Sequence, residues 1–193
     1  MVVIPLDGEW RLKYSSGQRG GYSTWPREQR FLPDYPVTVP GTVQEAMRHI
    51  TGDPAFGRNV LAARWIEEMI WNYTRTFTLT AEQAKMRARL VFEGLDLTAS
   101  IYVNGEFAGQ HNNFYMPCRI DITRYVHEGE NSITVVIESG LFYASKKSIE
   151  GLAGEWEPNN HLTHRMWLRK PQSSFEWDWS PRLVNVGIYK SCY

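Results

Sequence analysis

Apolar and polar side chains alternate most clearly between residues 70 and 80, IWNYTRTFTLT. Successive side chains of a strand point to opposite faces, so a period of two separates an apolar row from a polar row. The apolar row is Trp71, Tyr73, Phe77 and Leu79, and the polar row is Asn72, Thr74, Thr76 and Thr78. This pattern predicts a half-buried β-strand.

Arg75 interrupts the apolar row of this strand. An unpaired charge on a buried face is costly, so the guanidinium needs a carboxylate or a water-filled groove. We expect Arg75 to pair with an acid such as Glu93 or Asp96. A direct contact between Arg75 and a ligand is the less favoured interpretation.

Further strands are predicted at residues 87–93, 98–103 and 131–139, where β-branched and aromatic residues gather. Asn104-Gly105 stands between two of these runs, IYV and EFAG. That dipeptide tolerates two positive φ angles, which a tight turn between antiparallel strands requires. It therefore predicts a β-hairpin.

Short helices are expected after Thr42 and Thr80, because Glu45 and Gln83 stand three residues further on and complete capping boxes. Two stretches, 15–36 and 143–160, are expected to be long surface loops. Short strands without recurring strand-then-long-helix units predict an all-β fold. We expect a β-sandwich or jelly roll with short helices and long loops.

Charge excludes several classes of partner. The 193 residues contain 21 Lys and Arg and 21 Asp and Glu, so the formal net charge is zero and no broad field favours nucleic acid or anionic membrane. No stretch approaches the roughly 18 apolar residues of a membrane helix, and the start MVVIPLDGEW lacks the layout of a secretory signal. A soluble chain is expected, and its compartment is left open.

The sequence contains no motif for a metal or a cofactor. Cys118 and Cys192 can form at most one disulfide and have no zinc-ligand spacing. His161 and His164 are three residues apart, but no third ligand stands at a suitable distance. Neither a GxSxG setting nor a glycine-rich phosphate loop is present. We expect no cofactor.

The stretch most suggestive of chemistry is RKPQSSFEWDWSP, residues 169–181. If it is extended, Phe175, Trp177 and Trp179 point to one side and Glu176 and Asp178 to the other. From residue chemistry alone, buried tryptophans and solvated acids are favoured. In the alternative interpretation, Asp178 accepts hydrogen bonds from sugar hydroxyls and a tryptophan forms an apolar wall.

Glu176 and Asp178 are a poor candidate for a catalytic pair. Glycosidases place two carboxyl groups roughly 5 to 9 Å apart on either side of one bond. Acids two residues apart on a strand have about that separation, but they project side by side and do not flank a bond. No catalytic residue is therefore assigned.

Several segments, in order, resemble the N-terminal sugar-binding-like domain of family 2 glycoside hydrolases, and most closely its β-mannosidase branch. The matching segments are LDGEWRL (6–12), VPGTVQEA (39–46), WIEEMIWNYTRTFTL (65–79), FEGLDLTASIYVNGEFAGQH (92–111), DIT (121–123), EGENSITV (128–135) and RKPQSSFEWDWSPRLVNVGIY (169–189). Three positions depart from the pattern usual in that branch. Glu176 and Ser180 stand where glycines are frequent, and Tyr189 stands where tryptophan is frequent.

The resemblance implies a galactose-binding-domain-like jelly roll, residues 1–193, packed against a downstream catalytic barrel. Both catalytic glutamates would lie on that barrel, which needs roughly 250 residues of its own. Asp178 would bind hydroxyls of the nonreducing sugar, with Trp177 beside it, so the fragment alone would bind the glycoside weakly and cleave nothing. The alternatives are a self-sufficient carbohydrate-binding module, a domain of a β-galactosidase- or β-glucuronidase-like enzyme, and a purely structural domain.

Overall fold

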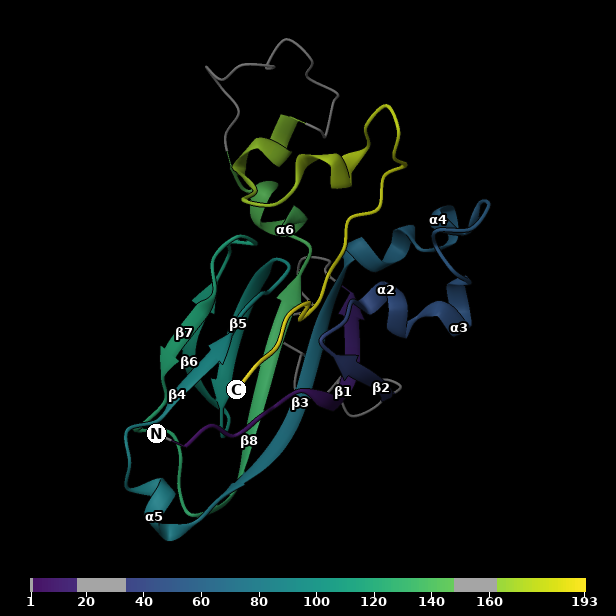
Figure 1. Ribbon diagram of the computed structural model, residues 1–193. Coiled ribbons are helices and arrows are strands. Elements are labelled where there is room, and N and C mark those ends of the chain that lie inside the picture. The colour runs from purple at the N-terminus through teal and green to yellow at the C-terminus, as the bar shows by residue number, and fades with distance from the viewer. Residues whose placement is uncertain (1, 17–33, 148–162) are drawn as a thin grey trace.

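The computed structural model describes residues 2–16, 34–147 and 163–193, which form a β-sandwich with short helices at its ends (Figure 1). The larger sheet has the order β2-β1-β3-β8-β5-β6, and every neighbouring pair is antiparallel. Its strands are β1 (Gly8–Ser16), β2 (Tyr35–Val39), β3 (Met69–Leu79), β5 (Thr98–Val103), β6 (Glu106–His111) and β8 (Gly129–Glu138). The expected all-β class is confirmed.

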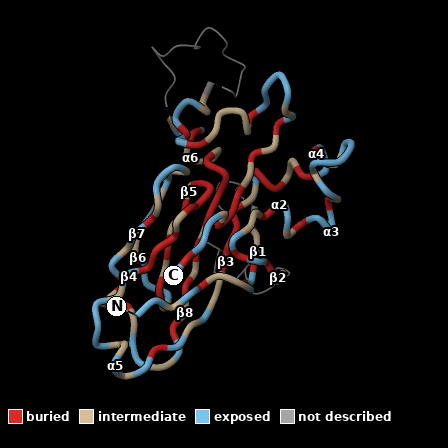
Figure 2. The backbone as a smooth tube through the Cα atoms, viewed as in Figure 1, coloured by how far each residue is buried: buried red, intermediate tan, exposed pale blue. Residues whose placement is uncertain are grey.

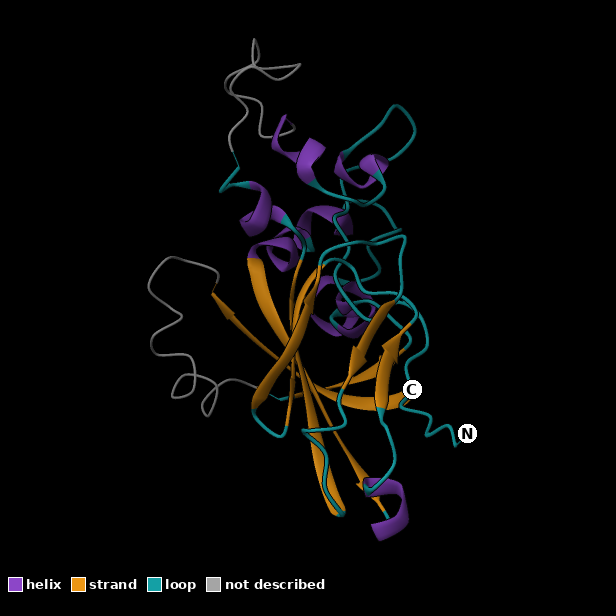
Figure 3. Ribbon diagram, turned by 90° about the vertical axis from the view of Figure 1, so that its left-hand side faces the viewer, coloured by secondary structure: helices purple, strands orange, loops and turns teal. Residues whose placement is uncertain are grey.

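The second layer is smaller. It contains β4 (Arg89–Phe92) and β7 (Cys118–Asp121), which pair in antiparallel fashion. The C-terminal segment joins β4 on its other side, since Val91 and Tyr193 exchange two backbone hydrogen bonds of 2.8 and 3.0 Å. This layer faces the large sheet, as the side view shows (Figure 3).

The core fills the space between the two layers (Figure 2). Inward side chains of the large sheet, among them Leu12, Tyr73 and Val135, are fully buried. They belong to one cluster with Phe92 of β4 and Ile188 of the C-terminal segment. The period-two pattern of the sequence places these residues there.

The strands and the hairpin predicted from sequence are confirmed. The predicted ranges 70–80, 98–103 and 131–139 correspond to β3, β5 and β8, and 87–93 contains β4. Asn104 and Gly105 connect β5 to β6 with φ angles of 51° and 83°. The long-loop predictions fall mostly on residues outside the described ranges. Of their described residues, 15–16 belong to β1, 35–36 to β2 and 143–144 to the helix α6.

The predicted pairing of Arg75 with an acid is wrong. Its Nη1 donates a 2.9 Å hydrogen bond to the carbonyl of Glu9. The ladder between β1 and β3 ends at the pair of Arg11 and Thr74, so the guanidinium reaches the backbone of β1 beyond the last paired residue. The two acids proposed as partners lie nearer to other cations.

Short helices lie between the strands. In the described part of the chain before β3, these are α2 (Val43–Ala46), α3 (Arg48–Thr51), α4 (Asn59–Ala62) and the 3₁₀ helix η2 (Arg64–Glu68). The helix α5 (Ala81–Ala84) lies at the end of the sandwich below β4, and α6 (Leu141–Ala144), η3 (Thr163–Trp167) and η4 (Gln172–Phe175) lie at the opposite end (Figure 1).

Both predicted capping boxes are present. Thr42 accepts a hydrogen bond from the amide of Glu45, whose carboxylate accepts one from the amide of Thr42. Thr80 and Gln83 form the same reciprocal pair at α5. The two helices differ in burial: α2 buries Val43, whereas no residue of α5 is buried.

This difference predicts unequal effects of removing the caps. Thr42→Ala should lower the free energy of unfolding by about 1 kcal/mol, because a lost N-cap costs roughly that much in a helix fixed to a core. Thr80→Ala, the matched control, should cost less than about 0.5 kcal/mol, since α5 can fray without disturbing buried residues. Urea unfolding of the two variants measures this, and equal losses would contradict the prediction.

Candidate functional site

Residues 175–183, here called the WDW loop, protrude at the end of the sandwich that carries α6 (Figure 1). The helix η4 ends at Phe175, and Glu176 follows with a φ of 98°. Trp177 and Ser180 then exchange backbone hydrogen bonds of 3.0 and 3.1 Å. A tight turn therefore places Asp178 and Trp179 at the tip.

The stretch is not extended, so the condition for the predicted division of its side chains is not met. A positive φ at Glu176 reverses the chain, and the amide of Leu183 closes the base of the loop by donating to the carbonyl of Ser174 at 3.0 Å. The period-two division of the side chains is consequently lost. Only Phe175 of the aromatic row enters the interior, where it packs with Leu97 and Val184.

The predicted burial of the two tryptophans is also wrong. Trp177 is 47% exposed and Trp179 is 76% exposed, and their ring centroids lie 6.0 Å apart in an edge-to-face arrangement. Asp178 between them is exposed, as is Glu176. The tip thus combines a solvated carboxylate with two open indole rings, the chemistry that contacts sugar hydroxyls and the apolar face of a sugar ring.

A buried ion pair fixes the C-terminal leg of the loop. Arg182 donates two hydrogen bonds, from Nε at 2.9 Å and from Nη2 at 2.7 Å, to one oxygen of Glu67. The two side chains are only 8% and 4% exposed. The guanidinium also stacks over the ring of Phe175, 5.4 Å from its centroid. Glu67 belongs to η2, so this pair ties the loop to a segment far away in sequence.

A second buried ion pair lies below the N-terminal leg. Nζ of Lys170 is 2.6 Å from a carboxylate oxygen of Asp96, and it donates to the carbonyl of Asn185 at 2.9 Å. The Lys170 side chain is fully buried, and that of Asp96 is 4% exposed. Burial raises the pKa of Asp96, and the Lys170 ammonium opposes that rise. This lysine therefore connects the chain before the loop, at Lys170, to the chain after it, at Asn185.

Gln172 braces η4 against η3. Its Nε2 lies within 3.2 to 3.3 Å of the carbonyls of Arg165, Leu168 and Lys170. A side-chain amide that serves the last carbonyls of a 3₁₀ helix satisfies groups that would otherwise lack partners. This explains why glutamine suits the fourth position of the RKPQ sequence.

The glycine of FEGLD has a steric role. A Cβ on Gly94 would lie 2.6 Å from the ring of Tyr189. Tyr189 stacks on Phe114 with ring centroids 4.4 Å apart, and its hydroxyl donates to the carbonyl of Phe114. The tyrosine that departs from the branch pattern is thus well accommodated.

Among the described residues, the cysteines and the histidine singled out in the sequence form no common cluster. Cys118 and Cys192 are free and buried, and burial raises their thiol pKa values to about 11 and about 12. Nδ1 of His164 lies 3.3 Å from the carbonyl of Ala144, whereas His161 falls outside the described residues. Within the described ranges, no group of three or more His, Cys, Asp or Glu side chains is placed to hold a metal ion.

Sequence reasoning proposed Asp178 and Trp177 but missed the anchoring residues Glu67, Lys170 and Arg182. Glu67 was visible only as part of the WIEE motif, and Lys170 as part of RKPQ. Glu67 lies in a mostly apolar stretch, WIEEMIW, where a buried charge requires a partner, but Lys170 stands among other polar residues and gave no such signal.

Residues 10–190 of the chain match the protein family described as glycosyl hydrolase 2 galactose-binding domain-like. A probable β-mannosidase of Caenorhabditis elegans is 34% identical over 97% of this chain, and a β-mannosidase of Bos taurus is 32% identical over 98%. The alignments cover 20% and 21% of those two proteins, so the chain spans about a fifth of the length of these curated relatives.

Solved structures give the same fold. A β-D-mannosidase from Dictyoglomus thermophilum superposes with a TM-score of 0.79 and 29% identity, over all of this chain and 22% of that one. A β-glucuronidase from Ruminococcus gnavus has a TM-score of 0.53 at 22% identity over 70% of this chain, which is a likeness of fold alone. In the described part of this chain, no helix is long and apolar enough to cross a membrane.

Proposed function

Because the chain belongs to the glycosyl hydrolase 2 galactose-binding domain-like family, we propose that it is the non-catalytic N-terminal domain, residues 1–193, of a β-mannosidase-like glycoside hydrolase. It packs on a downstream catalytic barrel and contributes one wall of the sugar subsite. In that wall, Asp178 accepts hydrogen bonds from sugar hydroxyls, and Trp177 lies beside it.

The single observation that carries this proposal is the WDW loop itself. Its tip exposes Asp178 and both tryptophans, while two buried ion pairs hold its base. Large aromatic side chains are normally buried, so an anchored loop that leaves them open to solvent is suited to meeting a ligand or another domain. A loop on a rigid scaffold also positions a carboxylate well.

Packing against a downstream domain is supported by the surface around this loop. Tyr115, Met116, Met166 and Trp167 are each more than 40% exposed at the same end of the sandwich. The amide of Phe114 donates to the carbonyl of Arg169, which brings the segment before Tyr115 close to the start of the loop. Apolar surface gathered at one end is typical of an interface between domains.

The geometry also supports assigning catalysis elsewhere. Glu176 and Asp178 both lie on the WDW turn and are solvated. A glycosidase needs its two carboxyl groups on opposite sides of one bond, which two acids of a single turn do not provide. We therefore expect the fragment to cleave no glycoside, and a glycoside to bind it weakly without the barrel.

Asp178→Ala in the longer protein tests the proposal. Hydrogen bonds to a charged group contribute about 1.5 to 3 kcal/mol, so kcat/KM for a β-mannoside should fall roughly 10- to 100-fold. Glu176→Ala is the matched control, because it removes a neighbouring exposed acid, and it should change kcat/KM less than about 3-fold. Normal kinetics in a correctly folded Asp178→Ala variant would favour a purely structural domain.

A self-sufficient carbohydrate-binding module is the alternative that calorimetry distinguishes. One wall of a pocket makes too few contacts to offset the entropy lost on binding, so titration of mannosides into residues 1–193 should give no measurable heat. Clear saturation by a glycan would support the module instead. Assays of the longer protein with β-mannosides, β-galactosides and β-glucuronides distinguish a β-mannosidase-like parent from a β-galactosidase- or β-glucuronidase-like one.

A further inference from the structure

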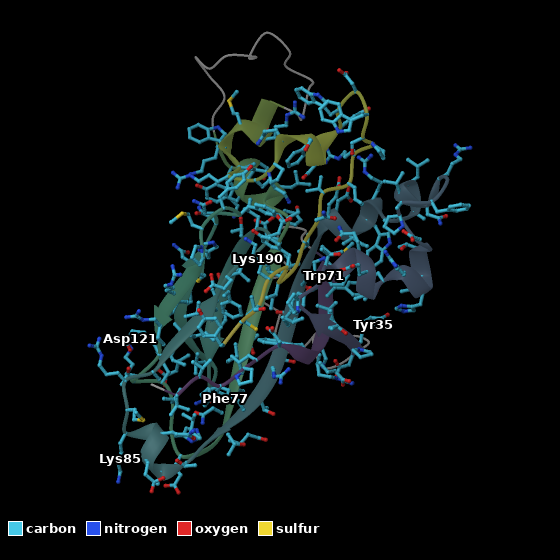
Figure 4. The ribbon with its side chains drawn as sticks, viewed as in Figure 1. Tyr35, Trp71, Phe77, Lys85, Asp121 and Lys190 are labelled. Atoms are coloured by element: carbon cyan, nitrogen blue, oxygen red, sulfur yellow. The ribbon has the colours of Figure 1, made fainter. Side chains whose placement is uncertain are left out.

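A groove of about 570 Å³ opens at the end of the sandwich opposite the WDW loop. Its floor is apolar and consists of Leu6, Phe77, Leu79, Leu90, Ile122 and Ile133. Figure 4 shows Phe77 and Asp121 on this part of the molecule, near Lys85 of the α5 region. The floor contains residues of both layers, so the groove is a gap between the two sheets.

The groove begins where the C-terminal segment stops pairing with β4. Val91 and Tyr193 exchange two backbone hydrogen bonds, and Tyr193 itself lines the groove. Backbone groups of alternate residues point to the same side of a strand, so the amide and carbonyl of Arg89 point to the same side as those of Val91. Among the described residues, no backbone group bonds Arg89 on that side.

The opposite wall of the groove is the N-terminal segment. Residues 2–4 line it, and the amide of Leu6 donates to the carbonyl of Cys192 at 2.9 Å. The C-terminal segment therefore runs between β4 and the N-terminal residues, and the groove continues the same space beyond Tyr193. One of its walls is the edge of β4, where a further strand can pair, and the other is the N-terminal segment 2–4, which belongs to no strand.

The alternation of side chains defines what fits. Cys192 is buried on the core side, whereas Tyr193 points outward and donates to the Glu93 carboxylate. A strand that continued this alternation would direct its first and third residues at the apolar floor and its second residue at solvent, beside Arg89.

We propose that this groove is the seat of a further β-strand, formed by polypeptide that follows Tyr193 in the longer protein and pairs with Arg89. Its first and third residues are apolar and fill the space beside Leu90 and Ile133. Two observations favour this segment as the occupant. The register of Val91 and Tyr193 leads directly from Tyr193 into the groove, and the curated relative from Caenorhabditis elegans is about five times as long as this chain. It is independent of what the WDW loop binds.

A disulfide placed across the new pair tests the register. In the longer protein, Arg89→Cys is combined with a cysteine at the second residue after Tyr193, which would form the next hydrogen-bonded pair after Val91 and Tyr193. The Cα atoms of such a pair lie about 5.5 Å apart, which suits a disulfide. Mild oxidation should link the two within one molecule, which non-reducing electrophoresis and peptide mass mapping detect.

Arg119→Cys with the same second cysteine is the control. Arg119 stands opposite Val91 on β7, one strand further away, so roughly 10 Å separates it from the proposed strand and no link should form. The natural thiols Cys118 and Cys192 are buried with raised pKa values, so they contribute little background.

Three results would overturn the proposal. If the Arg89→Cys pair stays reduced in the folded protein, no strand lies in this register. If both cysteine pairs form the disulfide to the same extent, the segment after Tyr193 is mobile and is not a strand paired with β4. A link between two molecules assigns the groove to a second copy of the chain.

Discussion

Lys170→Met should lower the free energy of unfolding of the protein by about 3 to 5 kcal/mol, the largest loss expected of any single substitution described here. The Lys170 side chain is fully buried, and its ammonium lies 2.6 Å from Asp96. Methionine preserves most of the volume but leaves a carboxylate uncompensated inside the protein. Chemical unfolding followed by tryptophan fluorescence measures the loss.

The loss should depend on pH with a definite sign. Burial raises the pKa of Asp96 above its ordinary value of 3.8, and Lys170 counteracts that rise. Without the ammonium, only the raising cause remains, so the folded protein binds a proton at Asp96 more readily than the unfolded chain does. The destabilisation therefore grows as the pH rises above about 4 through the folded pKa, and it shrinks below pH 4.

Arg11→Met is the control for this substitution, because Arg11 and Asp34 form an ion pair whose side chains are 50% and 36% exposed. Such pairs contribute about 0 to 1 kcal/mol. Adding Asp96→Asn to Lys170→Met should recover part of the stability by removing the buried charge. If Lys170→Met lowered the free energy of unfolding no more than Arg11→Met does, the ion pair of Lys170 and Asp96 would not stabilise the fold.

Arg182→Met should cost about 3 kcal/mol of stability and, under the proposed function, should also lower the kcat/KM of the longer protein. It removes both hydrogen bonds to Glu67 and the contact with the ring of Phe175. Glu67 then keeps Arg64, whose Nε lies 3.5 Å away, so its charge is not left entirely alone. The loss should thus be smaller than for Lys170→Met.

A double-mutant cycle of Arg182→Met with Glu67→Gln isolates the pair. We expect a coupling energy above about 1 kcal/mol, and kcat/KM lower in each single variant because the base of the WDW loop is released. Arg182→Lys should restore only part of the stability, because a lysine ammonium has one nitrogen and cannot donate to the Glu67 oxygen from two nitrogens as the guanidinium does. Independent effects of the two substitutions would show that the pair does not hold the loop.

Local signals in the sequence predicted local structure well. The Asn104-Gly105 turn and the capping boxes at Thr42 and Thr80 depend on a few adjacent residues, and all three are present. The strand at β3 was predictable because its alternation of apolar and polar residues is long enough to define a face.

The WDW loop could not be predicted from such signals. Its reversal depends on a positive φ at Glu176, a residue that rarely adopts it, and on a partner for Arg182 that lies 115 positions away. Burial preferences misled as well, because Trp177 and Trp179 are exposed. The resemblance to a known family named Asp178 and Trp177, but the pairs that hold them became visible only in three dimensions.

The separation between anchors and tip has a consequence for variation of this loop. The side chains of Lys170 and Arg182 are buried at its base, whereas residues 177–179 are exposed and the rings of Trp177 and Trp179 pack edge to face. Under the proposed function, fold and sugar recognition would therefore depend on different amino acids of this part of the chain. A library randomised at the three tip positions should remain folded throughout, so its members can be screened for altered sugar preference without first being sorted for stability.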